Sequence, residues 1–210
     1  MERLFVTGIG TDVGKTLVAA ILVEALGADY WKPVQAGLEP TTDTETVRGL
    51  VGNSASCFWP ERYRLCLPAS PHTAAAAEGV QLRAEDFALP LTTNHLVVEG
   101  AGGLLVPLAP DLLLADLLPA WQLAVVVVSR HYLGSLNHTL LTLEALRSRG
   151  IAVRGLVFNG EPAPANEQLL SRYANAPVLP PLLPEDEVTP NTVRRYAATY
   201  RAWLAGGNDL

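Results

Sequence analysis

A glycine-rich loop from Gly8 to Thr16 carries residue types that bind phosphate. Its glycines allow consecutive backbone N–H groups to turn toward one point, and the first turn of a following helix adds further free N–H groups. Lys15 supplies a mobile cation, and the Thr16 hydroxyl suits a magnesium ion. The apolar run 4–6 precedes the loop and a helical apolar pattern over 17–25 follows it, which is the order that such a loop requires. We therefore expect a nucleotide to bind here. The alternative is a plain turn before an ordinary helix.

Lysine usage singles out a second residue. Of the fifteen basic residues, only Lys15 and Lys32 are lysines, and the rest are arginines. Lysine differs from arginine most where a compact point charge on a titratable amine is needed. Lys32 is therefore a candidate catalytic residue, with chance placement as the alternative.

Polar residues also stand where apolar strand patterns end, as Lys32, Glu99 and Asn159 do. Ligands bind beyond the carboxyl ends of the strands in an open parallel sheet. Glu99 is placed like the acid that holds magnesium in nucleotide hydrolases, and the glycine-rich stretch 100–103 behind it allows a phosphate to approach closely. Asp43 is a weaker candidate, because a role as a helix N-cap explains it equally well.

Other kinds of catalytic site are not indicated. The four histidines have no metal-binding spacing, and the sequence contains neither a Gly-x-Ser-x-Gly elbow nor a cysteine nucleophile motif. We expect an enzyme that uses magnesium and a nucleotide and acts through electrostatics rather than through a covalent side-chain intermediate.

Alternating strand and helix patterns predict the elements that position these residues. Strands are expected near 4–6, 29–34, 95–99, 123–128, 153–158 and 177–179, and helices near 16–26, 43–51, 71–79, 134–149, 165–174 and 192–204. The stretch 52–71 is expected to be irregular. The alternation predicts an α/β fold with a mostly parallel β-sheet and helices on both faces. With no repeat or linker, residues 1–210 are expected to form a single domain.

Composition limits which binding partners and which cellular compartment fit this chain. The net charge of −6 provides no basic surface for nucleic acid, and 17% charged with 49% hydrophobic residues indicates a globular chain. Cys57 and Cys66 fit no zinc spacing and are expected to be reduced thiols. The first residues read as a strand rather than a signal peptide, and charges and prolines interrupt the apolar region 96–128. We expect a cytoplasmic protein that binds neither nucleic acid nor membrane.

Several segments taken together resemble the dethiobiotin synthetase family. In chain order they are Thr7–Thr16, Trp31–Gly37, Ser70–His72, Val98–Gly103, Leu133–His138 and Val157–Gly160. They cover most of the chain, and the Lys-Pro-Val and Glu-Gly-Ala-Gly-Gly pieces are far more specific than the loop alone. The resemblance implies a P-loop NTPase-like fold and a homodimer that uses ATP as co-substrate with Mg2+.

The resemblance also implies an ATP-dependent carboxylation that ends in ring closure, as a step of biotin biosynthesis. Carbon dioxide adds to one amine of 7,8-diaminononanoate (7,8-diaminopelargonate), and ATP phosphorylates the resulting carbamate. The second amine then attacks this carbamic-phosphoric anhydride, and the products are dethiobiotin, ADP and phosphate.

Site roles are implied position by position. Lys15 and Lys32 would hold the carbamate and the transferring phosphoryl group, and Thr11 would lie near the diamine. Thr16, Asp43 and Glu99 would bind magnesium. The nucleotide would contact Asp12, Val13, Gly14, Lys15, Thr16, Leu17, Asp43, Glu99, Gly100, Ala101, Gly102, Asn159, Gly160, Pro181, Leu182 and Leu183. The substrate would contact Thr11, Lys32 and Ala36, and also Gly134, Ser135 and Asn137 at a site shared between the two subunits.

Two positions depart from the family pattern. Ala36 stands where the family usually has Ser or Thr. Loss of one hydrogen bond, worth ~0.5–1.5 kcal/mol, predicts a weaker KM rather than a different reaction. Residues 179–184 look shortened and lack the usual glycine, so the selectivity for the nucleotide base stays open. Either Glu185 or Glu187 could contact the ribose, and the sequence does not decide between them.

Two other functions stay open on the sequence. A regulatory ATPase of the partitioning or division-site type would carry a second lysine five residues before Lys15, where this chain has Gly10. The apolar face of the final helix, with Val193 and Tyr200, fits a membrane surface or the helix's own domain. A small-molecule kinase would phosphorylate its acceptor without carbon dioxide.

Overall fold

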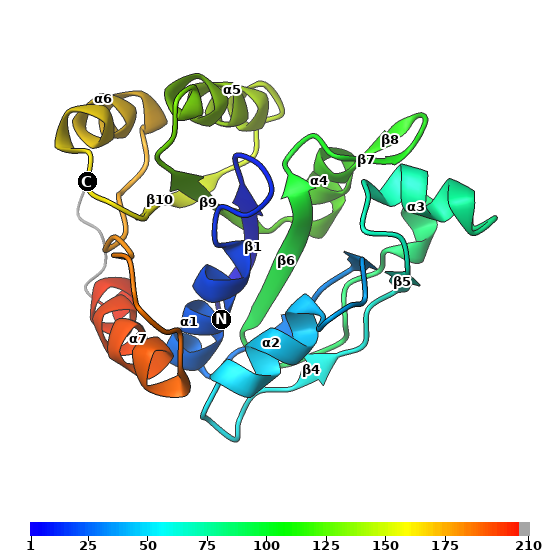
Figure 1. Ribbon diagram of the computed structural model, residues 1–210, viewed down its shortest axis with the longest axis horizontal. Helices are drawn as coiled ribbons and strands as arrows, with labels where there is room; N and C mark the ends of the chain where they lie inside the picture. The colour runs from blue at the N-terminus through cyan, green and yellow to red at the C-terminus, as the bar shows by residue number, and fades with distance from the viewer. Residues whose placement is uncertain (206–210) are drawn as a thin grey trace.

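A parallel sheet forms the centre of the molecule (Figure 1). In the computed structural model, which describes residues 1–205, six strands follow the order β10-β9-β1-β6-β2-β4. Every neighbouring pair among them is parallel. The strands are β1 (Arg3–Gly8), β2 (Asp29–Trp31), β4 (Phe58–Trp59), β6 (Leu96–Gly103), β9 (Ala124–Arg130) and β10 (Val153–Asn159).

Helices cover both faces of this sheet, so the predicted α/β fold is confirmed. On one face lie α1 (Lys15–Leu26), α2 (Asp43–Leu50) and α7 (Pro190–Ala205). On the other lie α3 (Pro71–Ala77), α4 (Leu118–Trp121), α5 (Ser135–Ser148) and α6 (Pro164–Ala174). Two 3-10 turns, Ala84–Asp86 and Leu114–Leu117, complete the second layer.

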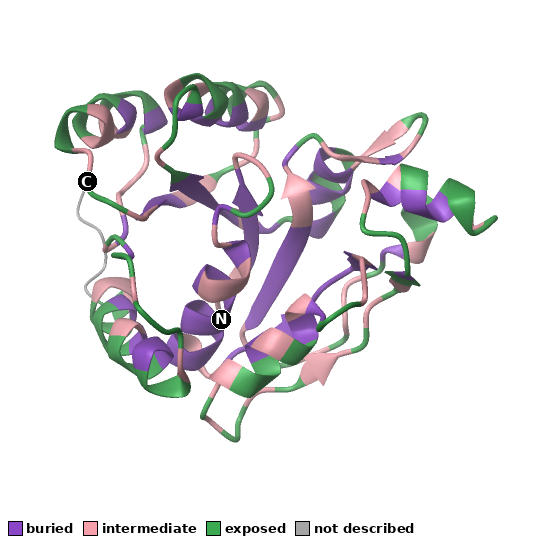
Figure 2. Cartoon of the chain, viewed as in Figure 1, coloured by how far each residue is buried: buried purple, intermediate pink, exposed green. Residues whose placement is uncertain are grey.

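Strand β1 shows how the sequence produces two cores. Leu4 and Val6 pack with α1 and α7, whereas Phe5 packs on the opposite face against Trp121, with ring centroids 6.0 Å apart. Successive side chains of a strand point to opposite faces, so a strand covered on both faces needs a continuous apolar run. Figure 2 shows the result, with the central strands buried and the outer helix surfaces exposed.

Helix α1 follows the phosphate loop and is enclosed by the sheet, α2 and α7. It begins after Gly14, whose φ is 98°, and ends before Gly27, whose φ is 60°. Both values favour glycine, and the Gly27 N–H donates to the Val23 carbonyl as a C-cap. The predicted stop at Gly27 is confirmed.

The terminal helix α7 packs its apolar face on α1. Val193 and Tyr200 are fully buried there, and Arg201 Nε donates to the Ala25 carbonyl at 3.0 Å. The face that suited a membrane surface is therefore the face that packs on the rest of the chain. Among residues 1–205, no helix is both long and apolar enough to cross a bilayer.

The predicted second strand ends close to Pro33, as the sequence predicts, and a separate short strand follows. β2 ends at Trp31, and β3 (Val34–Ala36) pairs instead with β5 (Tyr63–Leu65) in a separate parallel pair. Pro33 has no N–H to donate to a ladder and stands at the break. Lys32 therefore lies at a bend beyond the carboxyl end of β2. The stretch 52–71 also holds two short strands, β4 and β5, where irregular chain is predicted.

Two further strand predictions are wrong. The stretch 177–179 is not a strand, because it meets β10 only through isolated bridges such as Leu156–Val178. Prolines at 177, 180 and 181 remove the N–H donors that a ladder needs. Glu99 is not the last residue of β6, which continues to Gly103 before the small hairpin of β7 (Pro107–Ala109) and β8 (Leu112–Leu113).

Asp29 fixes the start of β2, the strand that leads to Lys32. Its carboxylate is 4% exposed and accepts hydrogen bonds from the Cys57 N–H and the side chains of Trp59, Thr92 and Asn94, at 2.7–3.2 Å. Burial raises the pKa of this carboxyl, but the hydrogen bonds outweigh burial and hold it below its ordinary value of 3.8.

We expect Asp29→Asn to lower the free energy of unfolding at pH 7 by about 1–3 kcal/mol, because an amide NH2 then faces donors. The folded-state pKa is depressed, so the carboxylate stabilises the fold above its ordinary pKa of 3.8 and loses that effect as pH falls through the folded value. The difference between wild type and variant should shrink below pH 3.8 in urea titrations.

The exposed Asp186 provides the matched control, because Asp186→Asn removes a carboxylate at the surface. It should unfold like the wild type at each pH. A difference for Asp29→Asn that is the same at neutral and acid pH contradicts the assignment.

Candidate functional site

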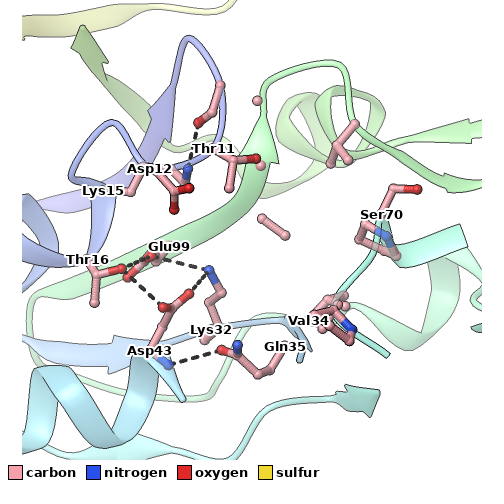
Figure 3. A pocket seen from close by; sticks show the side chains of 18 of the residues that line it. Thr11, Asp12, Lys15, Thr16, Lys32, Val34, Gln35, Asp43, Ser70 and Glu99 are labelled. Atoms are coloured by element: carbon pink, nitrogen blue, oxygen red, sulfur yellow. Dashed lines mark hydrogen bonds and ion pairs between the residues drawn. The ribbon is translucent and has the colours of Figure 1, made fainter. Parts of the chain in front are cut away.

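A cavity of about 880 Å³ opens at the carboxyl ends of β1, β2 and β6. Its walls are the phosphate loop, the β2–β3 bend, the first residue of α2, the end of β6 and the segment before α3. Figure 3 shows Lys15, Thr16, Lys32, Asp43 and Glu99 converging on it. Parallel connections place these strand ends at one edge of the sheet, as expected for a ligand site in this class of fold.

The loop itself is tightly built. A Cβ at Gly14 would lie 2.2 Å from Asn159 Nδ2, which donates to the Val13 carbonyl at 2.8 Å. Asp12 adopts a positive φ of 58°, and Arg130 donates to its carbonyl at 3.2 Å. The loop conformation therefore depends on glycine at position 14 and on the ends of β9 and β10.

Lys15 points into the cavity from the first turn of α1, and its Nζ donates to the Gly10 carbonyl at 2.8 Å. Burial and the nearby charge of Lys32 lower the pKa of Lys15 from its ordinary 10.5 to about 8. Two ammonium groups that repel one another favour an anion between them.

Lys32 is held by an acidic pair. Its Nζ lies 2.6 Å from Asp43 Oδ2 and 3.2 Å from Glu99 Oε1, and it donates to the Gly100 carbonyl at 2.8 Å. Lys32 is 3% exposed and Glu99 is fully buried. A buried cation needs partners of this kind, because an unpaired charge in the interior is strongly destabilising.

This arrangement sets the protonation of the cluster. Burial lowers the pKa of Lys32, but Glu99 and Asp43 outweigh burial and raise it above its ordinary value. Burial raises the pKa of Asp43, yet the Lys32 charge lowers it to a net value below the ordinary one. For Glu99, burial is the largest influence, and its pKa is raised despite Lys32. Lys32 is therefore an ammonium at neutral pH.

Oxygen donors that suit magnesium gather beside Lys32. The Thr16 hydroxyl lies 2.9 Å from Glu99 Oε1 and 3.2 Å from Asp43 Oδ1. Mg2+ takes oxygen ligands and commonly uses one or two carboxylates with substrate phosphates, so this donor set fits the ion. Within residues 1–205, no group of three or more His, Cys, Asp or Glu side chains forms a metal cage.

Asp43 reaches this site because another residue caps α2. The Thr42 side chain accepts from the Glu45 N–H, and the Glu45 side chain accepts from the Thr42 N–H, which forms a capping box. The alternative that Asp43 is only the N-cap is therefore wrong, and its carboxylate is free to contact Thr16 and Lys32.

Half of the predicted site residues line the cavity. These are Thr11, Asp12, Gly14, Lys15, Thr16, Lys32, Ala36, Asp43, Glu99, Ala101 and Gly102. Val13 is buried under the loop and Leu17 packs partly against the core around α1. At Gly100 a Cβ would lie 2.8 Å from the Phe5 ring, so glycine there allows β6 to pack closely.

The segment predicted to contact adenine lies beside Asn159 and Gly160. Leu182 is fully buried, and its backbone pairs with β10, because the Gly160 N–H donates to its carbonyl at 2.8 Å. Leu183 is 48% exposed, and Pro181 is also exposed. Glu185 is engaged by Arg195 and by the Tyr196 hydroxyl. Of the leucines predicted to meet the base, only Leu183 presents its side chain to the surface.

Gly134, Ser135 and Asn137 lie at the start of α5, outside the residues that line the cavity in the described structure. Gly134 caps the helix with a φ of 99°, and the buried Ser135 hydroxyl accepts from the Tyr132 N–H at 3.2 Å. Asn137 is exposed.

Sequence reasoning missed two residues that contact the acidic pair. Tyr30 donates to Glu99 Oε2 at 2.8 Å, and Gln35 Oε1 accepts from the Asp43 N–H at 3.1 Å. Burial and the Glu99 charge raise the pKa of Tyr30 well above its ordinary value, which keeps it a donor. Neither residue left a signal in the sequence, because the pairing of β2 with β6 directs Tyr30 and the bend at Pro33 directs Gln35.

Two solved proteins with a similar fold hold a nucleotide, according to their descriptions. A putative plasmid partition protein from Borrelia burgdorferi bound to AMPPNP aligns with a TM-score of 0.60 at 10% identity, over 98% of both chains. The septum site-determining protein MinD from Pyrococcus horikoshii, complexed with Mg-ADP, aligns with a TM-score of 0.55 at 15% identity, over 95% of this chain and 88% of that one. Identities this low show the fold alone, which is of the P-loop NTPase type.

Sequence relatives are much closer. A family model described as an AAA domain matches residues 2–192. The ATP-dependent dethiobiotin synthetase BioD of Christiangramia forsetii is 46% identical over 97% of this chain and 98% of its own. That of Cytophaga hutchinsonii is 48% identical over 94% and 96%, and that of Brucella ovis 48% over 88% and 90%. The chain thus belongs to the AAA domain family and, within it, to the ATP-dependent dethiobiotin synthetases.

Proposed function

We propose that this protein makes dethiobiotin from 7,8-diaminononanoate, carbon dioxide and ATP, as a step of biotin biosynthesis. Family membership supports the reaction. The observation that carries the proposal is the buried ammonium of Lys32, which faces the phosphate loop between Asp43 and Glu99.

The reaction needs two group transfers in one cavity. One amine attacks carbon dioxide and loses a proton to give a carbamate. A carbamate oxygen then attacks the γ-phosphorus of ATP, ADP leaves, and a carbamic-phosphoric anhydride forms. The second amine attacks the carbonyl carbon of this anhydride, closes the cyclic urea and releases phosphate.

Lys32 would stabilise negative charge rather than act as a base, because its raised pKa keeps it protonated. The carbamate and the transferring phosphoryl group are both anionic, and fixed donors in a water-poor site stabilise developing charge without reorganisation. Lys15 would hold the same phosphoryl group from the opposite wall, with Thr11 beside the diamine at the loop tip.

Thr16, Asp43 and Glu99 would hold Mg2+, which neutralises phosphate charge and orients the β- and γ-phosphates when bound. The loop from Asp12 to Leu17 and the glycines after Glu99 would surround the phosphates. Asn159 and Gly160, with the neighbouring segment 181–183, would contact adenine. The Asn159 amide donates to the Val13 carbonyl, which supports adjacent binding of the base and the phosphates.

A homodimer would complete the substrate site. Exposed apolar residues lie before and within α5, with Tyr132 at 45% and Leu133 at 104% exposure ahead of the helix and Leu141 at 58% in its middle. A second copy that covered this surface would bring Gly134, Ser135 and Asn137 to the carboxylate end of the diamine. We place the protein in the cytoplasm, where ATP and carbon dioxide are available.

Purified protein should release ADP only when the diamine, bicarbonate and Mg-ATP are all present, with a product of the mass of dethiobiotin. Each component is omitted in turn in a coupled ADP assay with mass spectrometry. ADP release that does not depend on the diamine contradicts the proposal. Phosphorylated diamine without bicarbonate would instead indicate a kinase, and ATP-dependent binding to anionic liposomes would indicate a regulatory ATPase.

Lys32→Gln should lower kcat at least ~10²-fold, because it removes a key charge-stabilising donor. Steady-state kinetics are measured at a temperature where circular dichroism shows the variant folded. Arg62→Gln is the control, since its ion pair with Asp86 lies outside the residues that line the cavity. A loss below tenfold would make Lys32 a structural residue.

Ala36→Ser should lower the KM for the diamine about two- to tenfold with kcat nearly unchanged, as one added hydrogen bond predicts. Ala36 lines the cavity beside Lys32 and Ser70, so a hydroxyl there meets the substrate region. An unchanged KM would show that another group already makes the contact.

A further inference from the structure

Tyr30 is a fully buried tyrosine that does not line the cavity. Its side chain extends toward the cluster of Lys32, Asp43 and Glu99. Tyr30 lies on β2, two residues before Lys32, which follows the end of that strand. The side chains of both residues donate to Glu99 on the neighbouring strand β6, where Trp31 pairs with Val98.

The two oxygens of Glu99 have different partners. Oε1 accepts from the Thr16 hydroxyl at 2.9 Å and from Lys32 at 3.2 Å, while Oε2 accepts from the Tyr30 hydroxyl at 2.8 Å. Within residues 1–205, Tyr30 is the sole protein donor to Oε2. Because Glu99 is fully buried, an oxygen left without a donor would bear the full cost of desolvation.

We propose that Tyr30 is a positioning residue that holds one oxygen of Glu99, so that the carboxylate is fixed in an orientation in which its other oxygen faces Thr16 and Lys32. The inference deepens the proposed function and rests on it where turnover is measured. Without the hydroxyl, Oε2 would lack its donor, and the Glu99 carboxylate would turn to bring both oxygens toward the Lys32 ammonium, which already contacts Oε1. That ammonium is already shared with Asp43 and the Gly100 carbonyl, so a closer pairing with Glu99 would draw it from the anionic substrate.

The ring of Tyr30 is held independently of its hydroxyl. Its centroid lies 6.1 Å from that of Phe58, and the ring belongs to the apolar core around α1. Tyr30→Phe therefore removes one oxygen atom and keeps the ring packing. Tyr63→Phe is a matched control, because the Tyr63 hydroxyl also donates to a carboxylate, Asp86 Oδ2 at 2.6 Å, away from the cavity-lining residues.

Tyr30→Phe should lower kcat about tenfold with the diamine KM within about twofold, as expected for loss of a hydrogen bond to a charged group. The Mg2+ concentration that half-saturates binding of a non-hydrolysable ATP analogue, measured by calorimetry at stepped Mg2+ levels, should rise about tenfold, because partners of metal ligands tune affinity by such factors. Tyr63→Phe should change neither quantity.

A double-mutant cycle separates positioning from general stability. In a Glu99→Gln background, Tyr30→Phe should change kcat and the half-saturating Mg2+ concentration less than about twofold, because the group it acts through is altered. Equal factors in both backgrounds overturn the proposal. So does a Tyr30→Phe protein with a lower melting temperature but wild-type kcat and Mg2+ dependence.

The two proposals fail differently. A wild-type protein that binds Mg2+ and the ATP analogue but does not turn over the diamine would end the proposed function. The Mg2+ titration of the Tyr30→Phe and Tyr63→Phe proteins would still decide the role of Tyr30.

Discussion

The site depends on one buried ion pair system, in which a single ammonium, Lys32, is shared by two carboxylates. Asp43 begins α2, Glu99 lies within β6 and Lys32 follows β2, so the cluster joins three elements that are distant in the chain. Charges removed from water are tolerated only when each has close partners of opposite sign. The rest of the architecture keeps these partners at bonding distance, and the cavity forms where they meet.

Backbone features provide that geometry at each of the three elements. The break at Pro33 turns Lys32 out of the sheet, and the capping box of Thr42 leaves the neighbouring Asp43 carboxylate free of a capping role. Continuation of β6 past Glu99 places that carboxylate inside the sheet rather than at its edge, which explains its complete burial. Glycine at position 100 then lets β6 lie against Phe5.

Much of this was predictable, for identifiable reasons. Parallel strands buried on both faces must be apolar along their length, so their order with the helices is visible in the sequence. Lys32 stood out because the chain otherwise uses arginine. The pairing of β3 with β5 and the isolated bridges at 177–182 depend on which backbone groups find partners, which local patterns do not encode. Tyr30 and Gln35 escaped notice because the pairing of β2 with β6 and the bend at Pro33 aim them. The predicted single domain includes residues 206–210, which lie outside the residues described.

Burial of both lysines has a practical consequence for covalent chemistry on this protein. Lys15 is 7% and Lys32 is 3% exposed, and the sequence holds no other lysine. Apart from the N-terminal amine, the molecule thus presents almost no primary amine to reagents in bulk solvent. An amine-selective acylating reagent small enough to enter the cavity would modify these two lysines. Their protection by a bound nucleotide could then be measured with almost no acylation of the outer surface.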